Sequence, residues 1–307
     1  LGVTARWGMT PNLALSAAVN PDFSQVEADA RQLDINEPFA LFYEEKRPFF
    51  MEGADYFDTP LNAVYTRMIR DPAWGLKLTG KTGPHTIGGY VVQDDVTNII
   101  IPGSQSSDGT SLEADNLATV LRYEHDIGNR HTVGALVTAR EGEDYSNRVA
   151  GLDGDFRITE QDRITLQLLG SSTSYPDNVA AAFDQPTGTF DDLATELVYE
   201  HKTRTVSWWG VYEDVGTDFR ADLGFMPRVD YRFGEVGTAY TWNATATSWY
   251  SRIDLELELN HSEDQAGGLL DQAAEVRLTV QGPLESNIEV EPTHRRERYD
   301  GREFEMD

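Results

Sequence analysis

The sequence predicts an all-β protein, an antiparallel up-and-down transmembrane β-barrel. Whether this chain alone supplies every strand of the barrel is left open. Three observations favour this fold class. Segments of about ten residues alternate polar and apolar side chains, tight turns alternate with long polar links, and no helical pattern exceeds about two turns. Membrane barrels have this rhythm, whereas a soluble β-sandwich has shorter strands and more even loops.

Composition narrows the choice of function. The 307 residues include 52 Asp and Glu against 25 Lys and Arg, a formal net charge of −27, which repels nucleic acids. No apolar run approaches the length of a membrane-spanning helix, but alternation conceals the apolar residues of barrel strands. The aromatic content of 10% is too high for a disordered acidic chain, and the lack of cysteine excludes disulfides and thiol chemistry.

The clearest strand is residues 249–260. Trp249, Ile253, Leu255, Leu257 and Leu259 lie on one face, and the opposite face carries Arg252, Asp254, Glu256, Glu258 and Asn260. A helix would scatter these charges around all its sides, so the period of two indicates a strand. With the aliphatic face toward lipid, Arg252, Asp254, Glu256 and Glu258 are predicted to face the lumen.

The same alternation recurs along the chain. Residues 115–125, 192–200, 273–281 and 286–291 repeat it, which adds Glu124, Glu196 and Glu200 to the predicted lumen face. Weaker patterns predict strands at 13–19, 74–82, 85–93, 131–140, 163–170, 205–214 and 231–242. Long polar links are expected at 94–114 and 171–191.

The chain divides into an N-terminal strand pair with an irregular inward or crossing segment, residues 1–60, and barrel strands, residues 61–307. Within the irregular segment, charges of both signs stand between aromatic residues, which suits a ligand-facing segment or an ion-paired latch. We favour the latch, formed by Glu44, Glu45, Lys46, Arg47 and Glu52. Lys46 and Arg47 are expected to meet carboxylates of the barrel wall.

Two motifs point to binding sites that the pattern does not favour. Residues 75–82 match the phosphate-binding loop G-x-x-x-x-G-K-[ST], but they alternate as a strand and no helix follows. Asp22, Glu27 and Asp29 could hold a hard cation, and Asp153-Gly154-Asp155 is the nearest approach to a calcium loop. Among 52 acidic residues such clusters arise by chance, so we predict no metal site.

The sequence shows no catalytic machinery. Its six histidines form no zinc-protease motif, and no nucleophile elbow occurs. We therefore predict no catalytic residue and no cofactor.

The N-terminal part resembles a known family. The residues that carry the resemblance are Thr10-Pro11-Asn12-Leu13, residues 19–29 (VNPDFSQVEAD) and residues 45–54 (EKRPFFMEGA), with looser matches at 77–83 and 298–304. They are similar to a bacterial family of domains of unknown function. In that family the domain follows an N-terminal carbohydrate-binding module of the family-nine type. The resemblance implies a Gram-negative envelope protein with an outer-membrane barrel. The carbohydrate-binding module is absent from this chain, as is a final strand ending in Phe or Trp.

The predicted function is an outer-membrane barrel that admits or binds a solute, located in the bacterial outer membrane. Its expected partners are outer-membrane lipid and a saccharide or a cationic solute, and we expect no nucleic acid. Two alternatives remain open: a secreted all-β carbohydrate-active enzyme, and a structural or interaction barrel with no transport role.

Overall fold

The computed structural model describes residues 2–21, 38–299 and 301–306. Asp22, Glu27 and Asp29, the first cation cluster considered from the sequence, lie outside the described residues. The chain forms two compact units. Unit 1 comprises residues 1–154, 167–194 and 216–230, and unit 2 comprises residues 155–166, 195–215 and 231–307.

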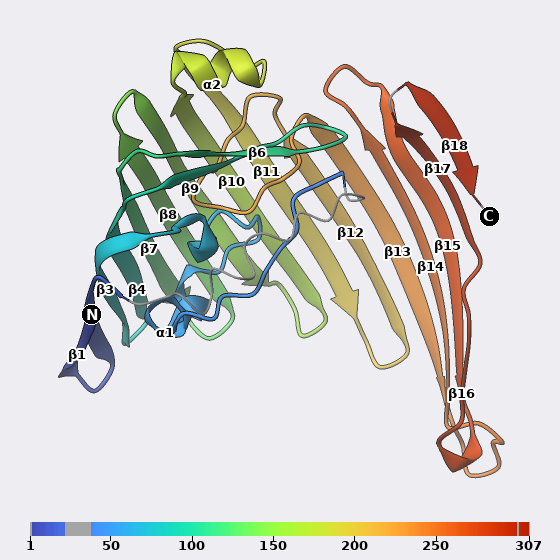
Figure 1. The fold of residues 1–307 in the computed structure, drawn as a ribbon. Coiled ribbons are helices and arrows are strands. Elements are labelled where there is room, and N and C mark those ends of the chain that lie inside the picture. The colour runs from blue at the N-terminus through green and yellow to red at the C-terminus, as the bar shows by residue number, and fades with distance from the viewer. Residues whose placement is uncertain (1, 22–37, 300, 307) are drawn as a thin grey trace. The chain divides into compact units, whose positions relative to one another are not determined.

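Long β-strands dominate both units (Figure 1). The strands are β1 (Val3–Thr10), β2 (Leu13–Val19), β3 (Pro72–Thr82), β4 (His85–Asp94), β5 (Thr97–Ile101), β6 (Asp108–Leu112), β7 (Asn116–Ile127), β8 (His131–Gly142), β9 (Tyr145–Arg157), β10 (Asp162–Ser174), β11 (Thr189–Lys202), β12 (Val206–Val215), β13 (Tyr231–Asn243), β14 (Arg252–Glu263), β15 (Leu269–Gln281), β16 (Asn287–Val290), β17 (Thr293–Tyr299) and β18 (Arg302–Met306). The short helices are α1 (Pro48–Met51), η2 (Ala54–Phe57), η3 (Thr66–Met68), α2 (Asp177–Ala182) and η4 (Pro283–Glu285). No helix in the described part of the chain is long and apolar enough to cross a membrane.

The strands pair in chain order. Hydrogen bonding follows β1-β2-β3-β4-β7-β8-β9-β10-β11-β12-β13-β14-β15-β17-β18, with β16 beside β15 and a separate hairpin of β5 and β6. The pairs from β1 to β8 and from β12 to β18 are antiparallel. The predicted all-β, antiparallel, up-and-down fold is therefore confirmed.

Each predicted strand segment overlaps a strand of the structure, and residues 75–82 lie within β3. Some strands were not predicted. One is β9, which contains Asp153-Gly154-Asp155, and Arg122 and Arg163 pair with these two carboxylates. Others are the separate β5–β6 hairpin, which lies inside the expected polar link, and β17, which follows β16 after a short break.

The long links of unit 1 all leave the sheet at one end, because every second connection of an antiparallel meander lies at the same end. Their described residues are 20–21 with 38–71, 95–115, 175–188 and 216–230, and the last link was not predicted. The first link continues past residue 60, and the sheet resumes at Pro72.

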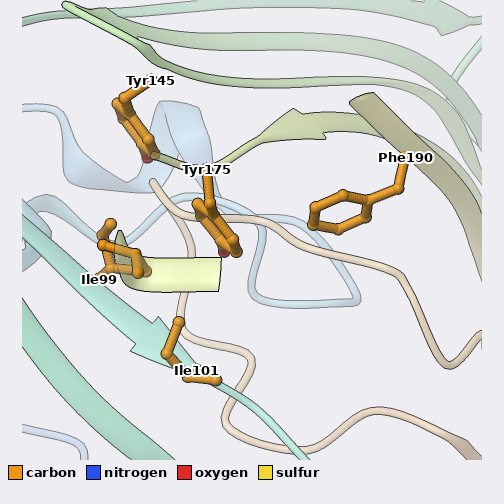
Figure 2. Close-up of a cluster of buried hydrophobic side chains, with 6 residues drawn as sticks. Ile99, Ile101, Tyr145, Tyr175 and Phe190 are labelled. Atoms are coloured by element: carbon orange, nitrogen blue, oxygen red, sulfur yellow. The ribbon is translucent and has the colours of Figure 1, made fainter. Parts of the chain in front are cut away.

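A small apolar core holds two of these links against the strands. Ile99 and Ile101 of β5 pack with Tyr145, Tyr175, Val179 and Phe190 (Figure 2). Tyr145 and Tyr175 stack with their ring centroids 6.1 Å apart, and Tyr175 meets Phe190 edge-on. The β5–β6 hairpin is thus anchored to β9, β11 and the link that carries α2.

The register of β13 on β14 can be tested in a chain that has no native cysteine. Thr238 is paired with Leu257, so Thr238→Cys with Leu257→Cys should form a disulfide under mild oxidation, since paired Cα atoms lie about 4.5–5.5 Å apart. Thr238→Cys with Glu258→Cys places the thiols on opposite faces and should stay reduced. Free-thiol titration distinguishes the two, and cross-linking of the second pair alone would contradict the register.

Candidate functional site

In the unit 1 sheet, apolar side chains are exposed and charged side chains are buried, which is the reverse of the pattern in soluble proteins. On β7, the Leu121 residue is 54% exposed whereas Arg122 is 3% exposed. Their partners on β8 differ in exposure in the same way, because Val137 is exposed and Leu136 is buried. The face that carries Leu121 is apolar and exposed, and we call it the outer face. The opposite, inner face buries charged side chains such as Arg122 and Arg140 together with apolar ones such as Val120 and Leu136.

Unit 2 has the same two kinds of face. Ile253, Leu255, Leu257 and Leu259 share the outer face with Val276 and Leu278 of β15, and Leu259 is 57% exposed. Aromatic residues gather at one end of this face, near the turns at 203–205 and 244–251: Trp208, Tyr240 and Trp242. Aromatic girdles of this kind mark the interface between lipid and water in membrane barrels.

The predicted lumen-facing residues of unit 2 lie on its inner face. Asp254, Glu256 and Glu258 alternate with the leucines of β14. Arg252 pairs with Asp254 at 2.6 Å, and Arg277 of β15 pairs with Glu256 at 2.8 Å and with Glu275 and Glu291. Glu196 and Glu200 lie on β11, and Glu200 is 3.8 Å from Arg163.

In unit 1, Glu124 is bound to Arg122 at 2.8 Å. That these carboxylates line a lumen stays a prediction.

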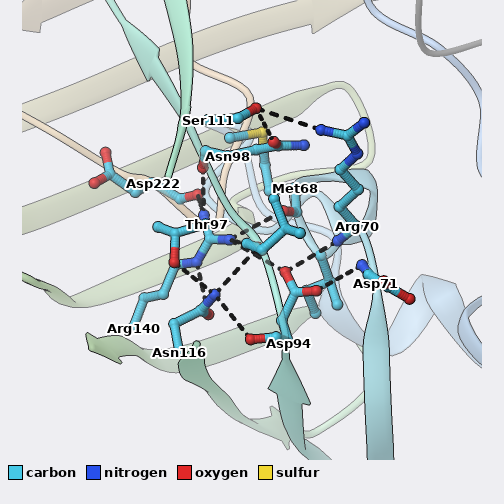
Figure 3. A network of polar contacts seen from close by, with 12 residues as sticks. Met68, Arg70, Asp71, Asp94, Thr97, Asn98, Ser111, Asn116, Arg140 and Asp222 are labelled. Carbon is cyan, nitrogen blue, oxygen red and sulfur yellow. Dashed lines mark hydrogen bonds and ion pairs between the residues drawn. The ribbon is translucent and has the colours of Figure 1, made fainter. Parts of the chain in front are cut away.

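The inner face of unit 1 is organised around Arg140, whose side chain is fully buried (Figure 3). Its Nε donates to Asn116 Oδ1 at 2.9 Å, and its Nη2 donates to Asp94 Oδ2 at 3.3 Å. The remaining acceptors are backbone carbonyls of three different links: Met68, Val96 and Asn98, and Asp222. One side chain on β8 therefore joins the links 38–71, 95–115 and 216–230. We call these groups the Arg140 cluster.

Asp94 extends the cluster. Its carboxylate accepts hydrogen bonds from the backbone N–H groups of Arg70 at 3.0 Å and Asp71 at 2.6 Å. Asn116 donates to Thr97 Oγ1 at 2.9 Å and to the carbonyl of Val96 at 3.3 Å. The point where the 38–71 link rejoins the sheet is thereby fixed to β4 and β7.

Asp222 anchors the 216–230 link. Its carboxylate accepts hydrogen bonds from the hydroxyls of Tyr145 at 2.7 Å and Tyr175 at 3.1 Å, and its N–H donates to Asn147 Oδ1. Burial raises the pKa of Asp222, and the Tyr145 hydroxyl and the Arg140 charge offset only part of that rise.

The structure brings together part of the predicted ion-pair set. Glu45 binds the buried Arg47 through both carboxylate oxygens, at 2.8 and 2.6 Å, and Glu52 pairs with Arg6 of β1. The backbone N–H of Lys46 donates to Glu45 at 3.0 Å, and Arg67 donates to the carbonyl of Glu44.

Besides Glu45, Arg47 donates to the carbonyls of Thr66 and Ile69, which belong to its own link. That Lys46 and Arg47 meet carboxylates of the barrel wall stays a prediction. A cation of the wall also holds the link. Lys77 of β3 is buried and donates to the carbonyls of Phe49 and Glu52.

The sequence analysis missed Arg140, Asp94, Asn116 and Asp222. The available signal was weak: a lone arginine on the inner face of a predicted strand, with an Asp or Asn at the ends of its neighbours. No group of three or more His, Asp or Glu side chains in the described residues could hold a metal ion.

Comparison with known proteins gives one family match, over the N-terminal part of the chain. A family model described as a domain of unknown function (DUF5916) matches residues 1–76, which include the segment that carries the family resemblance. No curated protein matches the chain.

Several solved structures are similar in the path of the chain. The crystal structure of OccK11 (OpdR) of Pseudomonas aeruginosa has a TM-score of 0.44 and 10% identity over 95% of this chain and 74% of its own. OccK8 (OprE) of the same organism has a TM-score of 0.36 and 12% identity over 73% and 76%. The toluene transporter TodX of Pseudomonas putida has a TM-score of 0.30 and 9% identity over 74% and 78%. Similarities at such scores carry no argument about function.

Loss of Arg140 should loosen the links. Arg140→Ala leaves Asp94 buried without its cation, which costs about 3–5 kcal/mol of unfolding free energy for a broken buried pair. Urea titration of the folded protein, with limited proteolysis of the 95–115 and 216–230 links, measures the effect. Arg148→Ala, which removes an exposed arginine paired with Glu141, is the control and should change little. Equal stability of the two variants would contradict the role of the cluster.

The Glu45–Arg47 pair should give the 38–71 link a dependence on pH. Burial alone would raise the pKa of Glu45, but the hydrogen bonds and charge of Arg47 and the Thr66 hydroxyl lower it below its ordinary value of 4.5. The stabilisation is therefore present above pH 4.5 and is lost as pH falls through the lowered pKa.

Glu45→Gln should weaken protection of the link by about 2 kcal/mol at neutral pH, and the difference from wild type should vanish in strong acid. Amide hydrogen exchange over residues 43–50 measures it. Glu44→Gln, a change at the exposed neighbouring glutamate, should match wild type throughout. A constant difference from wild type at every pH would contradict the ionic explanation.

Proposed function

We propose that this chain forms part of a Gram-negative outer-membrane β-barrel that admits or binds small solutes. The observation that supports the proposal is the exposed apolar face of the sheet. In each unit exposed Leu, Val and aromatic side chains share one face, and the charged side chains lie on the opposite face, which in unit 1 also buries apolar residues such as Val120 and Leu136. A sheet in water would not leave so apolar a face uncovered.

Lipid is the surrounding that this arrangement suits. Exposed aliphatic residues such as Leu121 and Leu257 favour hydrocarbon, where a charged side chain would cost about 2–4 kcal/mol at mid-depth. In a meander of long antiparallel strands, each strand between the two edges satisfies its backbone groups by pairing on both sides. A membrane requires this of every strand, so the proposal needs the edge strands β1 and β18 to be paired as well. An outer-membrane location follows from the proposal, because transmembrane barrels of this kind belong to that membrane.

The links on the inner face of unit 1 favour a selective path over an open pore. Three of them converge on Arg140 and are fixed by buried hydrogen bonds. A solute passing along this face would contact the links themselves. We propose a carbohydrate-related solute as the finer assignment, and the cavity described below supports it.

Ion selectivity gives a direct test of the proposal. The inner face of unit 2 carries Asp254, Glu256 and Glu258, and rings of carboxylate favour cations in a pore. Planar bilayers containing the protein under a salt gradient should show conductance with a cation-selective reversal potential. The preference should weaken at high salt, because the Debye length falls from about 10 Å at 0.1 M to about 3 Å at 1 M.

Asp254→Asn, Glu256→Gln and Glu258→Gln together should shift the reversal potential toward zero, and Glu285→Gln, in a turn, is the control. Failure of the protein to enter bilayers would overturn the proposed function. Anion selectivity, or a reversal potential unchanged by the triple variant, would overturn the role of these three carboxylates.

A further inference from the structure

A cavity of about 400 Å³ lies between the 38–71 link and strands β3 and β4 of unit 1. Its walls include five aromatic rings, those of Phe42, Phe50, Phe57, Tyr65 and Tyr90. This volume is within the range of about 300–1,000 Å³ that small-molecule sites occupy. Polar side chains line the rest of the cavity together with three small apolar residues, and the polar ones are Glu45, Asp58, Thr59, Asn62, Thr66 and Lys77.

Phe42 is the exposed ring of this group. Its side chain is 54% exposed, yet it packs against Tyr65 with a centroid distance of 4.9 Å and against Phe225 at 5.3 Å. The Tyr65 hydroxyl is fixed in turn, because it donates to the carbonyl of Tyr43 and accepts from its N–H group. A large apolar ring held rigidly with one side uncovered is a preformed platform, since covering it removes apolar area from water at little entropic cost.

The charged groups of the cavity balance. Lys77 is buried in the wall with two carbonyl acceptors and no carboxylate within ion-pair distance in the described residues, so one of its three N–H donors is still available. Asp58 also lines the cavity, and no hydrogen-bond donor in the described residues binds its carboxylate. The charge of Glu45 is matched by Arg47. The cavity thus offers one cationic donor and one anionic acceptor beside an aromatic platform.

This chemistry favours a neutral ligand that both donates and accepts hydrogen bonds. Lys77 would repel a cation, and Asp58 would repel an anion. Hydroxyl groups satisfy both polar residues at once, and the C–H face of a saturated ring covers an aromatic ring without charge. We propose that this cavity is a binding site for a neutral, ring-shaped, polyhydroxylated solute of monosaccharide size. The inference rests on the proposed function and specifies the class of solute.

Three probes with the same ring separate the charge classes: glucose, its acid glucuronate and its amine glucosamine. Calorimetric titration of the full chain in detergent should show millimolar binding of glucose, with both charged forms weaker. Xylose, galactose and inositol extend the test to other neutral polyols. Binding of none of the neutral compounds, or tighter binding of either charged form, would overturn the proposal.

Phe42→Ala removes the platform from an exposed position and should weaken glucose binding about tenfold without unfolding the link. Phe304→Ala is the matched control, because Phe304 on β18 is 48% exposed and is not one of the residues that line the cavity. Asp58→Asn should weaken binding by a smaller factor, because the amide still accepts one hydrogen bond. Equal affinities of the Phe42→Ala variant and wild type would also overturn the proposal.

The bilayer measurement separates this inference from the proposed function. A protein that conducts but binds no neutral polyol retains the function and loses the site. A protein that binds glucose through Phe42 but never enters a bilayer retains the cavity as a polyol site and loses its role in transport across a membrane.

Discussion

A buried positive charge needs every one of its donors satisfied, and the inner side of unit 1 is built to meet that demand at Arg140. The guanidinium has five N–H donors, and the cluster supplies two side-chain acceptors and carbonyls from three links. Because one strand alone could not provide these acceptors, the links must fold inward for the charge to be buried. The cavity beside Phe42 lies between the first of these links and strands β3 and β4.

The two faces of the sheet are a consequence of how neighbouring strands pair. Residues directly opposite each other on neighbouring strands point to the same side, so Leu121 with Val137 and Arg122 with Leu136 extend two continuous faces. A shift of register by one residue would turn Arg122 to the outer side. The aromatic residues near the turns of unit 2 and the aliphatic residues between them follow this constraint strand by strand.

The alternation that makes two faces also makes the strands predictable from the sequence. Residues 249–260 could be assigned because leucine and glutamate alternate without interruption, whereas β9 was missed because Gly151 and Gly154 interrupt its pattern. The Arg140 cluster could not be predicted in the same way. The groups that bind Arg140 lie 24 to 82 positions from it in the sequence. Nothing near Arg140 in the sequence indicates which distant carbonyls it will bind. The Glu45–Arg47 pair is two residues apart, and such proximity is visible in a sequence.

The acceptors that Arg140 takes from the links are main-chain oxygens, and every amino acid carries one. Side chains at Met68, Val96 and Asn98 can therefore be exchanged in evolution without removing the oxygen that Arg140 binds. Asp222 differs, because its carboxylate also anchors its link through Tyr145 and Tyr175. For the first two links, attachment to Arg140 does not depend on the side chains that they carry. A lineage of such proteins could diversify what it recognises by altering the inward segments, while the same arginine on the same strand continues to secure them.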